Sequence, residues 1–93
     1  MGSTKVTDEK LERTLVRIPP CTLPVEAYGR QPLEWSASRP PVWAWISWPH
    51  KPAEKIAAFA HAWNDRVVIV HWDGPAGAVN TVVWRIAVTR RRT

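Results

Sequence analysis

The stretch that decides the fold of this chain reads Trp63-Asn64-Asp65-Arg66-Val67-Val68-Ile69-Val70-His71-Trp72-Asp73-Gly74. Residues 66–72 are rich in β-branched side chains and stop at Asp73-Gly74-Pro75, which is the composition and the punctuation of a β-strand. Asn64 and Asp65, which precede them, favour tight turns. We therefore expect a strand over 66–72 that begins directly after a turn.

Two further runs have the same β-type composition. Residues 42–48, which read Val-Trp-Ala-Trp-Ile-Ser-Trp, are aromatic and β-branched and end at Pro49. Residues 81–89 form the third run and follow a loop with two glycines. Because the run 66–72, this loop and the run 81–89 follow one another directly, the sequence predicts a hairpin.

Residues 53–63 fit two structures, and the first is a helix. Pro52 stands near the first helical position, where proline is tolerated, and five alanines follow in residues 53–63. The side chains that would share one helical face are Ile56, Phe59, Ala60 and Trp63. This structure gives an α+β fold, in which a helix at 53–63 packs on a three-stranded sheet.

The second structure is a strand over 56–63 that pairs with residues 66–72 across a turn at Asn64 and Asp65. That hairpin sets Trp63 opposite Arg66, His61 opposite Val68 and Phe59 opposite Val70. One face then collects the bulky side chains, which are Phe59, Trp63, Val68, Val70 and Trp72. Alanine favours the helix because its strand propensity is low, but we prefer the strand because a small barrel needs its bulk on one face.

With strands near 42–48, 56–63, 66–72 and 81–89, the second half of the chain resembles the SH3-like or Tudor-like small β-barrel. The resemblance lies in the alternation and turns of residues 63–74 and 81–88. It implies a compact, mainly β domain over 42–93, built as a small SH3-like barrel or a twisted antiparallel sheet. Such barrels usually bind peptides, methylated side chains or nucleic acid and are rarely enzymes, so the resemblance implies a binding module.

Residues 1–41 differ from the rest in composition. Six prolines between positions 19 and 41 remove backbone donors and restrict their neighbours, which excludes a regular helix there. We expect an extended, Pro-rich N-terminal arm over 1–41. Its candidates for contact with a partner or with its own domain are apolar side chains: Val25, Tyr28, Leu33 and Trp35.

The net charge of +5 is concentrated in the second half, where residues 42–93 carry seven Lys/Arg against three Asp/Glu. A basic domain attracts polyanions, and the usual polyanion in a cell is nucleic acid. The candidates for contacts with DNA or RNA are six basic side chains and one indole: Arg85, Arg90, Arg91, Arg92, Lys51, Lys55 and Trp48.

Seven tryptophans in this chain raise the question of which indoles are exposed. In a strand, Trp43 and Trp45 share a face and Trp48 has the opposite parity, so at least one of the three is hard to bury. An exposed indole beside arginines is a platform on which bases stack. Apart from such an exposed indole, we expect the core to hold most of five tryptophans, which are Trp43, Trp45, Trp63, Trp72 and Trp84.

The sequence shows no constellation typical of an enzyme or a metal site. Cys21 is the only cysteine and has no histidine near it in the chain. In the expected hairpin, His61 and His71 point to opposite faces and do not share an ion. The loop at 74–77 matches no phosphate-binding motif. We therefore expect no catalytic residues, no metal and no cofactor.

Two functions remain. The first is a small, basic, non-catalytic module that binds DNA or RNA. The second is a protein-interaction or assembly subunit, such as a phage or mobile-element protein that docks on a larger assembly through its Pro-rich arm. The single cysteine and the lack of a long apolar run predict a cytoplasmic protein without membrane contact, or a protein within a virion in the second case.

Overall fold

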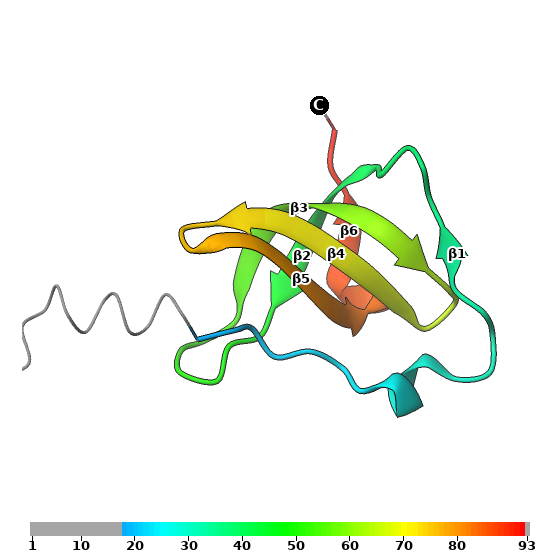
Figure 1. Cartoon of the computed structure of the whole chain (residues 1–93), viewed down its shortest axis with the longest axis horizontal. Helices are drawn as coiled ribbons and strands as arrows, with labels where there is room; N and C mark the ends of the chain where they lie inside the picture. Colours follow the sequence, from blue (N-terminus) through cyan, green and yellow to red (C-terminus); the bar gives the residue numbers. More distant parts are fainter. Residues whose placement is uncertain (1–17, 93) are drawn as a thin grey trace, which may run out of the picture.

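The computed structural model describes residues 18–92, which form a mainly β fold with a six-stranded antiparallel sheet (Figure 1). The strands are β1 (Glu34–Trp35), β2 (Pro41–Ile46), β3 (Glu54–Trp63), β4 (Val67–Gly74), β5 (Gly77–Trp84) and β6 (Val88–Arg90), and the two 3-10 turns are η2 (Val25–Tyr28) and η3 (Arg85–Ala87). The mainly β prediction is therefore confirmed. The segment 53–63 is a strand for most of its length, and the helical alternative is wrong.

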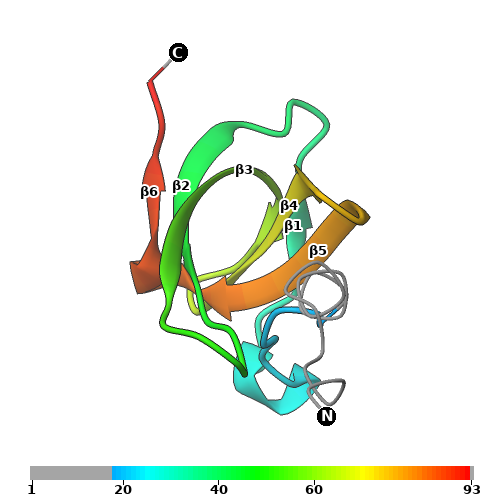
Figure 2. The ribbon, with the colours of Figure 1, turned by 90° about the vertical axis from the view of Figure 1, so that its left-hand side faces the viewer.

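The strands are connected in a simple order. Hairpin connections join β2, β3, β4 and β5, and β6 returns after η3 to pair with β2, so the sheet order is β5-β4-β3-β2-β6. The short β1 pairs with the end of β3. Figure 2 shows that the sheet curls into a ring. This curled antiparallel sheet is consistent with the SH3-like small barrel that the sequence resembles.

The inside of the ring is filled by alternate residues of the four long strands. In β2, the buried Val42, Ala44 and Ile46 alternate with the exposed Trp43 and Trp45. The core cluster continues through the other three strands with Ala58, Ala60, Val68, Val70, Trp72 and Val83. Alanines occupy the inside of β3 because a tightly curled sheet leaves room for small side chains beside large ones such as an indole.

The register of β3 with β4 differs from the expected one. Phe59 pairs with His71 and Ala60 with Val70, and a β-bulge then shifts the pairing before Ala62. In the first part of β3 the pairing is displaced by one residue from the expected register. A displacement by one residue places a side chain on the opposite face from the one expected. The prediction that Phe59 faces the core with Val70 is wrong, because Phe59 lies outside and is 43% exposed.

The turn between β3 and β4 and the β-bulge together explain the displacement. The turn makes Val68 instead of Arg66 the partner of Trp63, a shift of two residues, and the bulge reduces the shift to one residue. Asn64 is buried and its side-chain oxygen accepts hydrogen bonds from the backbone N–H groups of Arg66 (2.8 Å) and Val67 (3.0 Å). The backbone N–H of Asn64 donates to the carbonyl of Val67 at 3.1 Å. Arg66 thus belongs to the turn and not to the strand, so the first strand pair is Trp63 with Val68.

The described part of the N-terminal arm runs along the sheet and is hydrogen-bonded to it (Figure 1). The N–H of Leu23 donates to the carbonyl of Val82 (3.0 Å), and the N–H of Val82 donates to the hydroxyl of Thr22 (2.9 Å). The buried hydroxyl of Thr81 donates to the carbonyl of Cys21 at 2.7 Å. These bonds satisfy the backbone groups of Val82 on the edge of β5, which would otherwise be unpaired. The first 17 residues of the expected arm lie outside the described residues.

Candidate nucleic-acid interface

The outer surface of β2 and β3 carries exposed aromatic rings next to basic side chains. Strand alternation places Trp43, Trp45 and Phe59 outside, with exposed fractions of 37%, 52% and 43%. Lys55 stands opposite Trp45 in the β2–β3 pairing and is also exposed. Together with Arg91, which contacts two of the rings, these residues form what we call the outer aromatic face: Trp43, Trp45, Lys55, Phe59 and Arg91.

Two cations of the outer aromatic face lie over its rings. The ammonium nitrogen of Lys55 is 5.4 Å from the centre of the Trp43 ring. The guanidinium carbon of Arg91 is 5.8 Å from the Trp43 ring and 5.2 Å from the Phe59 ring. These distances are within the range of cation–π attraction. The face therefore joins positive charge to exposed ring surface.

Arg91 is held in place by the backbone of two strands. Its Nε donates to the carbonyl of Val42 at 3.3 Å, and its Nη2 donates to the carbonyl of Ala58 at 3.0 Å. Its own N–H donates to the carbonyl of Pro41 at 3.1 Å. A guanidinium has five N–H donors, so these two side-chain bonds leave others for an anion. Arg91 is thus an ordered part of the sheet surface.

The structure does not bring all the predicted basic residues together. Lys55 and Arg91 belong to the outer aromatic face, and the exposed Arg92 follows Arg91 in the chain. Arg90 pairs with the inward-facing Val42, so strand alternation directs its side chain away from the outer aromatic face. Arg85 lies apart, where its Nη1 donates to the carbonyl of Asn64 at 2.8 Å.

Lys51 lies at an end of the ring, where its ammonium group forms an ion pair with Glu54 at 2.9 Å. The same ammonium group is 4.8 Å from the centre of the Trp48 ring.

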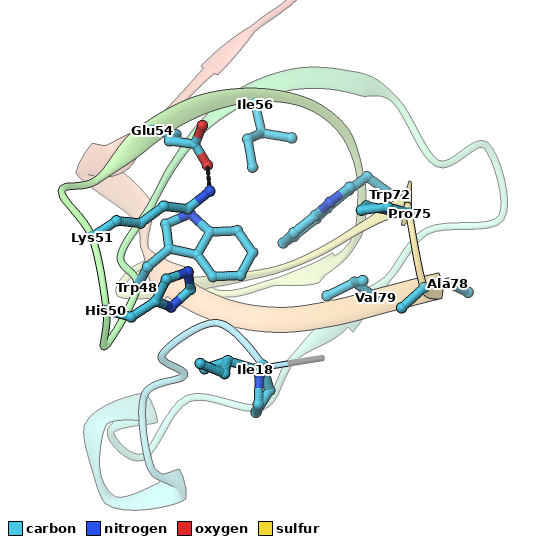
Figure 3. A pocket seen from close by; sticks show the side chains of 14 residues that line it. Ile18, Trp48, His50, Lys51, Glu54, Ile56, Trp72, Pro75, Ala78 and Val79 are labelled. Carbon is cyan, nitrogen blue, oxygen red and sulfur yellow. Dashed lines mark ion pairs between the residues drawn. The ribbon is translucent and has the colours of Figure 1, made fainter. Parts of the chain in front are cut away.

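Trp48 is half-buried and is not the exposed indole of its segment. Its ring packs edge-on against Trp72, with ring centres 6.4 Å apart. Figure 3 shows both indoles lining a cavity of about 640 Å³, with Ile56 and Val79 on its other walls. Trp48 thus contributes to the interior of the ring, and the exposed rings nearby are those of Trp43 and Trp45.

The prediction that most indoles lie in the core is wrong for Trp43, Trp45 and Trp84, the last of which is 46% exposed. The aliphatic side chains of β2 face the inside of the ring, namely Val42, Ala44 and Ile46. The indoles face outward because the interior of so small a ring has little space for them. Trp72 alone is fully among the buried core residues, while Trp48 and Trp63 pack partly against that core. The signal that sequence reasoning missed is that aliphatic residues alternate with the tryptophans in this strand and form its inward face.

Two histidines that were expected on opposite faces lie side by side. The rings of His61 and His71 are stacked with centres 4.8 Å apart and an angle of 28° between them. The prediction failed because it used the wrong register for β3 and β4. Within residues 18–92, no group of three or more His, Cys, Asp or Glu side chains is arranged to hold a metal ion.

The four apolar candidates for partner contact differ in exposure. Val25 and Trp35 are 66% and 68% exposed, whereas Tyr28 and Leu33 are half-buried. The carbonyl of Tyr28 accepts a hydrogen bond of 2.9 Å from the side-chain amide of Asn64, which ties this part of the arm to the β3–β4 turn. Only Val25 and Trp35 therefore offer much free surface.

The described part of the chain contains no helix with the length and apolar character needed to cross a membrane. Comparisons of the chain with protein-family models, with curated proteins and with solved structures find no match.

Proposed function

We propose that the protein is a non-catalytic module that binds single-stranded DNA or RNA on the outer aromatic face. The observation that carries this proposal is the pairing of exposed indoles with an arginine that the sheet backbone holds beside them. Surfaces that bind single strands combine these elements: aromatic rings stack on bases, and cations follow the phosphates.

The chemistry of the face favours a single strand over a duplex. Trp43, Trp45 and Phe59 present ring surface, and a base must be unstacked from its neighbours to lie on a protein ring. Arg91, Arg92 and Lys55 supply the positive charge for phosphates. Because stacking and phosphate contacts carry little base information, we expect weak sequence preference.

The charge around the face supports the same function. Glu54 is the acidic residue nearest in sequence to Lys55, and its carboxylate is already paired with Lys51. The long strands and the C-terminal segment thus leave the cations of the outer aromatic face free to attract a polyanion over a distance set by the Debye length.

The test compares two exposed tryptophans. Trp45→Ala removes a ring from the outer aromatic face, and Trp35→Ala removes an even more exposed ring from β1. Binding is measured by fluorescence anisotropy with labelled oligothymidylate and oligouridylate in low salt. Loss of one stacked base corresponds to about 1–3 kcal/mol, so W45A should weaken binding roughly 5- to 150-fold while W35A should leave it unchanged. Equal affinities of W45A and the wild type would contradict the proposal.

A second candidate function is docking on a protein partner or a larger assembly through the arm. It is favoured by the exposure of Val25 and Trp35, two large apolar side chains with little cover. The same two variants separate the candidates when the protein is purified from its own cell. Loss of a co-purifying protein with W35A and not with W45A would support docking, and the reverse loss of nucleic acid would exclude it as the main role.

A further inference from the structure

A cluster of one arginine, two histidines and one aspartate lies at the end of the outer aromatic face. A cavity of about 360 Å³ is lined by Ser38, Arg39, Phe59, His61, His71 and Asp73. Phe59 belongs to both surfaces, because its ring also contacts Arg91. A strand of nucleic acid that leaves the aromatic rings across Phe59 therefore reaches this cavity next.

The loop that carries Arg39 is fixed above β3. The N–H of Ser36 donates to the carbonyl of His61 at 2.9 Å, and the N–H of Ala60 donates to the carbonyl of Pro40 at 2.9 Å. Between these anchors, Arg39 has a φ of 45°, which is uncommon for a residue other than glycine. Its N–H donates to the hydroxyl of Ser36 at 3.3 Å. Backbone strain of this kind persists only where the surroundings hold it.

The two imidazoles in the cavity have different surroundings. The Nδ1 of His71 is 2.9 Å from the side-chain oxygen of Asn80, so this nitrogen donates. The other ring nitrogen accepts in the neutral ring and donates to an anion only when the ring is protonated. The Nε2 of His61 is buried without a hydrogen-bond partner among the described residues. Burial lowers the pKa of His61 below its usual 6.5, and the charges of Arg39 and His71 act in the same direction.

The charges around the imidazoles favour an anion only when a histidine is protonated. Arg39 faces them from the loop, Asp73 faces them from β4, and the neighbour of His71 on β5 is the neutral Asn80. At neutral pH one guanidinium and one carboxylate are charged. As the pH falls, the stacked histidines add positive charge that the single carboxylate of Asp73 does not balance.

We infer that this cavity binds a phosphate group, and that in the complex it holds a backbone phosphate of the strand that stacks on the outer aromatic face. This inference rests on the proposed function. Arg39 and the hydroxyl of Ser38 are the phosphate ligands in the neutral site, the second ring nitrogen of His71 adds a donor when that ring is protonated, and a protonated His61 attracts the phosphate through its charge. Phosphate binding and histidine protonation then strengthen each other, so the affinity for nucleic acid rises from pH 7.5 to pH 5.5.

The test follows the histidines directly. The C2–H signals of all three histidines are titrated by proton NMR in the full chain, alone, with an octathymidylate and with inorganic phosphate, at constant ionic strength. His50 lies in the other cavity and serves as the internal control. We expect both ligands to raise the pKa values of His61 and His71, and to leave that of His50 in place.

A double variant tests the coupling. His61→Gln with His71→Gln should lose the gain of about threefold or more in affinity for the octathymidylate that the wild type shows between pH 7.5 and pH 5.5. Arg39→Gln should weaken binding at both pH values.

The outcomes separate this inference from the proposed function. If the octathymidylate binds but neither ligand moves the pKa values of His61 and His71, the phosphate site is wrong and the proposed function stands. If inorganic phosphate moves them but the octathymidylate does not bind, the phosphate site stands and the proposed function is wrong. If the double variant keeps the full pH dependence of the wild type, the histidines are not its source and the inference is wrong.

Discussion

At the scale of single residues, the position of His61 in the bulge of β3 has a consequence for stability. The bulge brings its ring onto that of His71 and buries its Nε2. The folded state therefore holds a proton on His61 less tightly than the unfolded state does. Its environment favours the neutral ring and makes protonation unfavourable.

This difference predicts a pH dependence of unfolding. The pKa of His61 in the folded state lies below 6.5, so the unfolded state binds more protons at mildly acidic pH. Stability from the neutral ring is present above pH 6.5 and is lost as the pH falls through the folded-state pKa. Urea unfolding between pH 7.5 and pH 5 should show a smaller decline for His61→Gln than for the wild type. Parallel declines would mean that His61 is not responsible.

At the scale of the strands, the sequence predicted where the strands lie better than how they pair. The runs 42–48 and 66–72 cover most of β2 and β4, because β-branched and aromatic residues between turn residues are a local property of the sequence. The expected strand 81–89 is wrong as one element, since it holds the second half of β5, the turn η3 and the start of β6. The pairing of β3 was not predictable in the same way. It depends on Asn64, whose side chain bonds four backbone groups and sets the width of the turn.

The same distinction explains the candidate site. Lys55 and Arg91 were predicted from charge, but the exposed rings beside them were not, because alternation in β2 does not say which parity faces inward. That choice is made by the whole ring, whose interior accommodates the aliphatic side chains of β2 and leaves Trp43 and Trp45 outside. Phe59 was misplaced by the register alone.

The attachment of the arm to β5 is testable by one hydroxyl. Thr81 is buried, and its Oγ1 donates to the carbonyl of Cys21. Thr81→Val leaves that carbonyl unpaired, so we expect a loss of about 1–2 kcal/mol in unfolding free energy and faster hydrogen exchange at the N–H of Leu23. The matched control is Thr89→Val on β6, where the side chain is exposed and the expected change is under about 0.5 kcal/mol. Equal effects of the two variants would contradict this role of the arm.

At the scale of the whole molecule, the charge distribution predicts the salt dependence of binding. If Lys55, Arg91 and Arg92 each neutralise one phosphate of a single strand, the logarithm of the affinity should fall with the logarithm of the salt concentration with a slope of about −2. Lys55→Gln should reduce the steepness by about 0.7. Anisotropy titrations between roughly 50 and 300 mM salt measure this slope, because phosphate contacts respond over about that range. A slope near zero would exclude phosphate contacts as the source of affinity.

The central claim is that the outer aromatic face is the surface that meets nucleic acid. The most direct measurement records the indole N–H signals of the seven tryptophans by NMR while octathymidylate is added to the full chain. We predict that the signals of Trp43 and Trp45 shift most, and that those of the buried Trp72 and of Trp35 on β1 stay in place. Shifts confined to Trp35, or no shift of any indole signal at low salt, would contradict the claim.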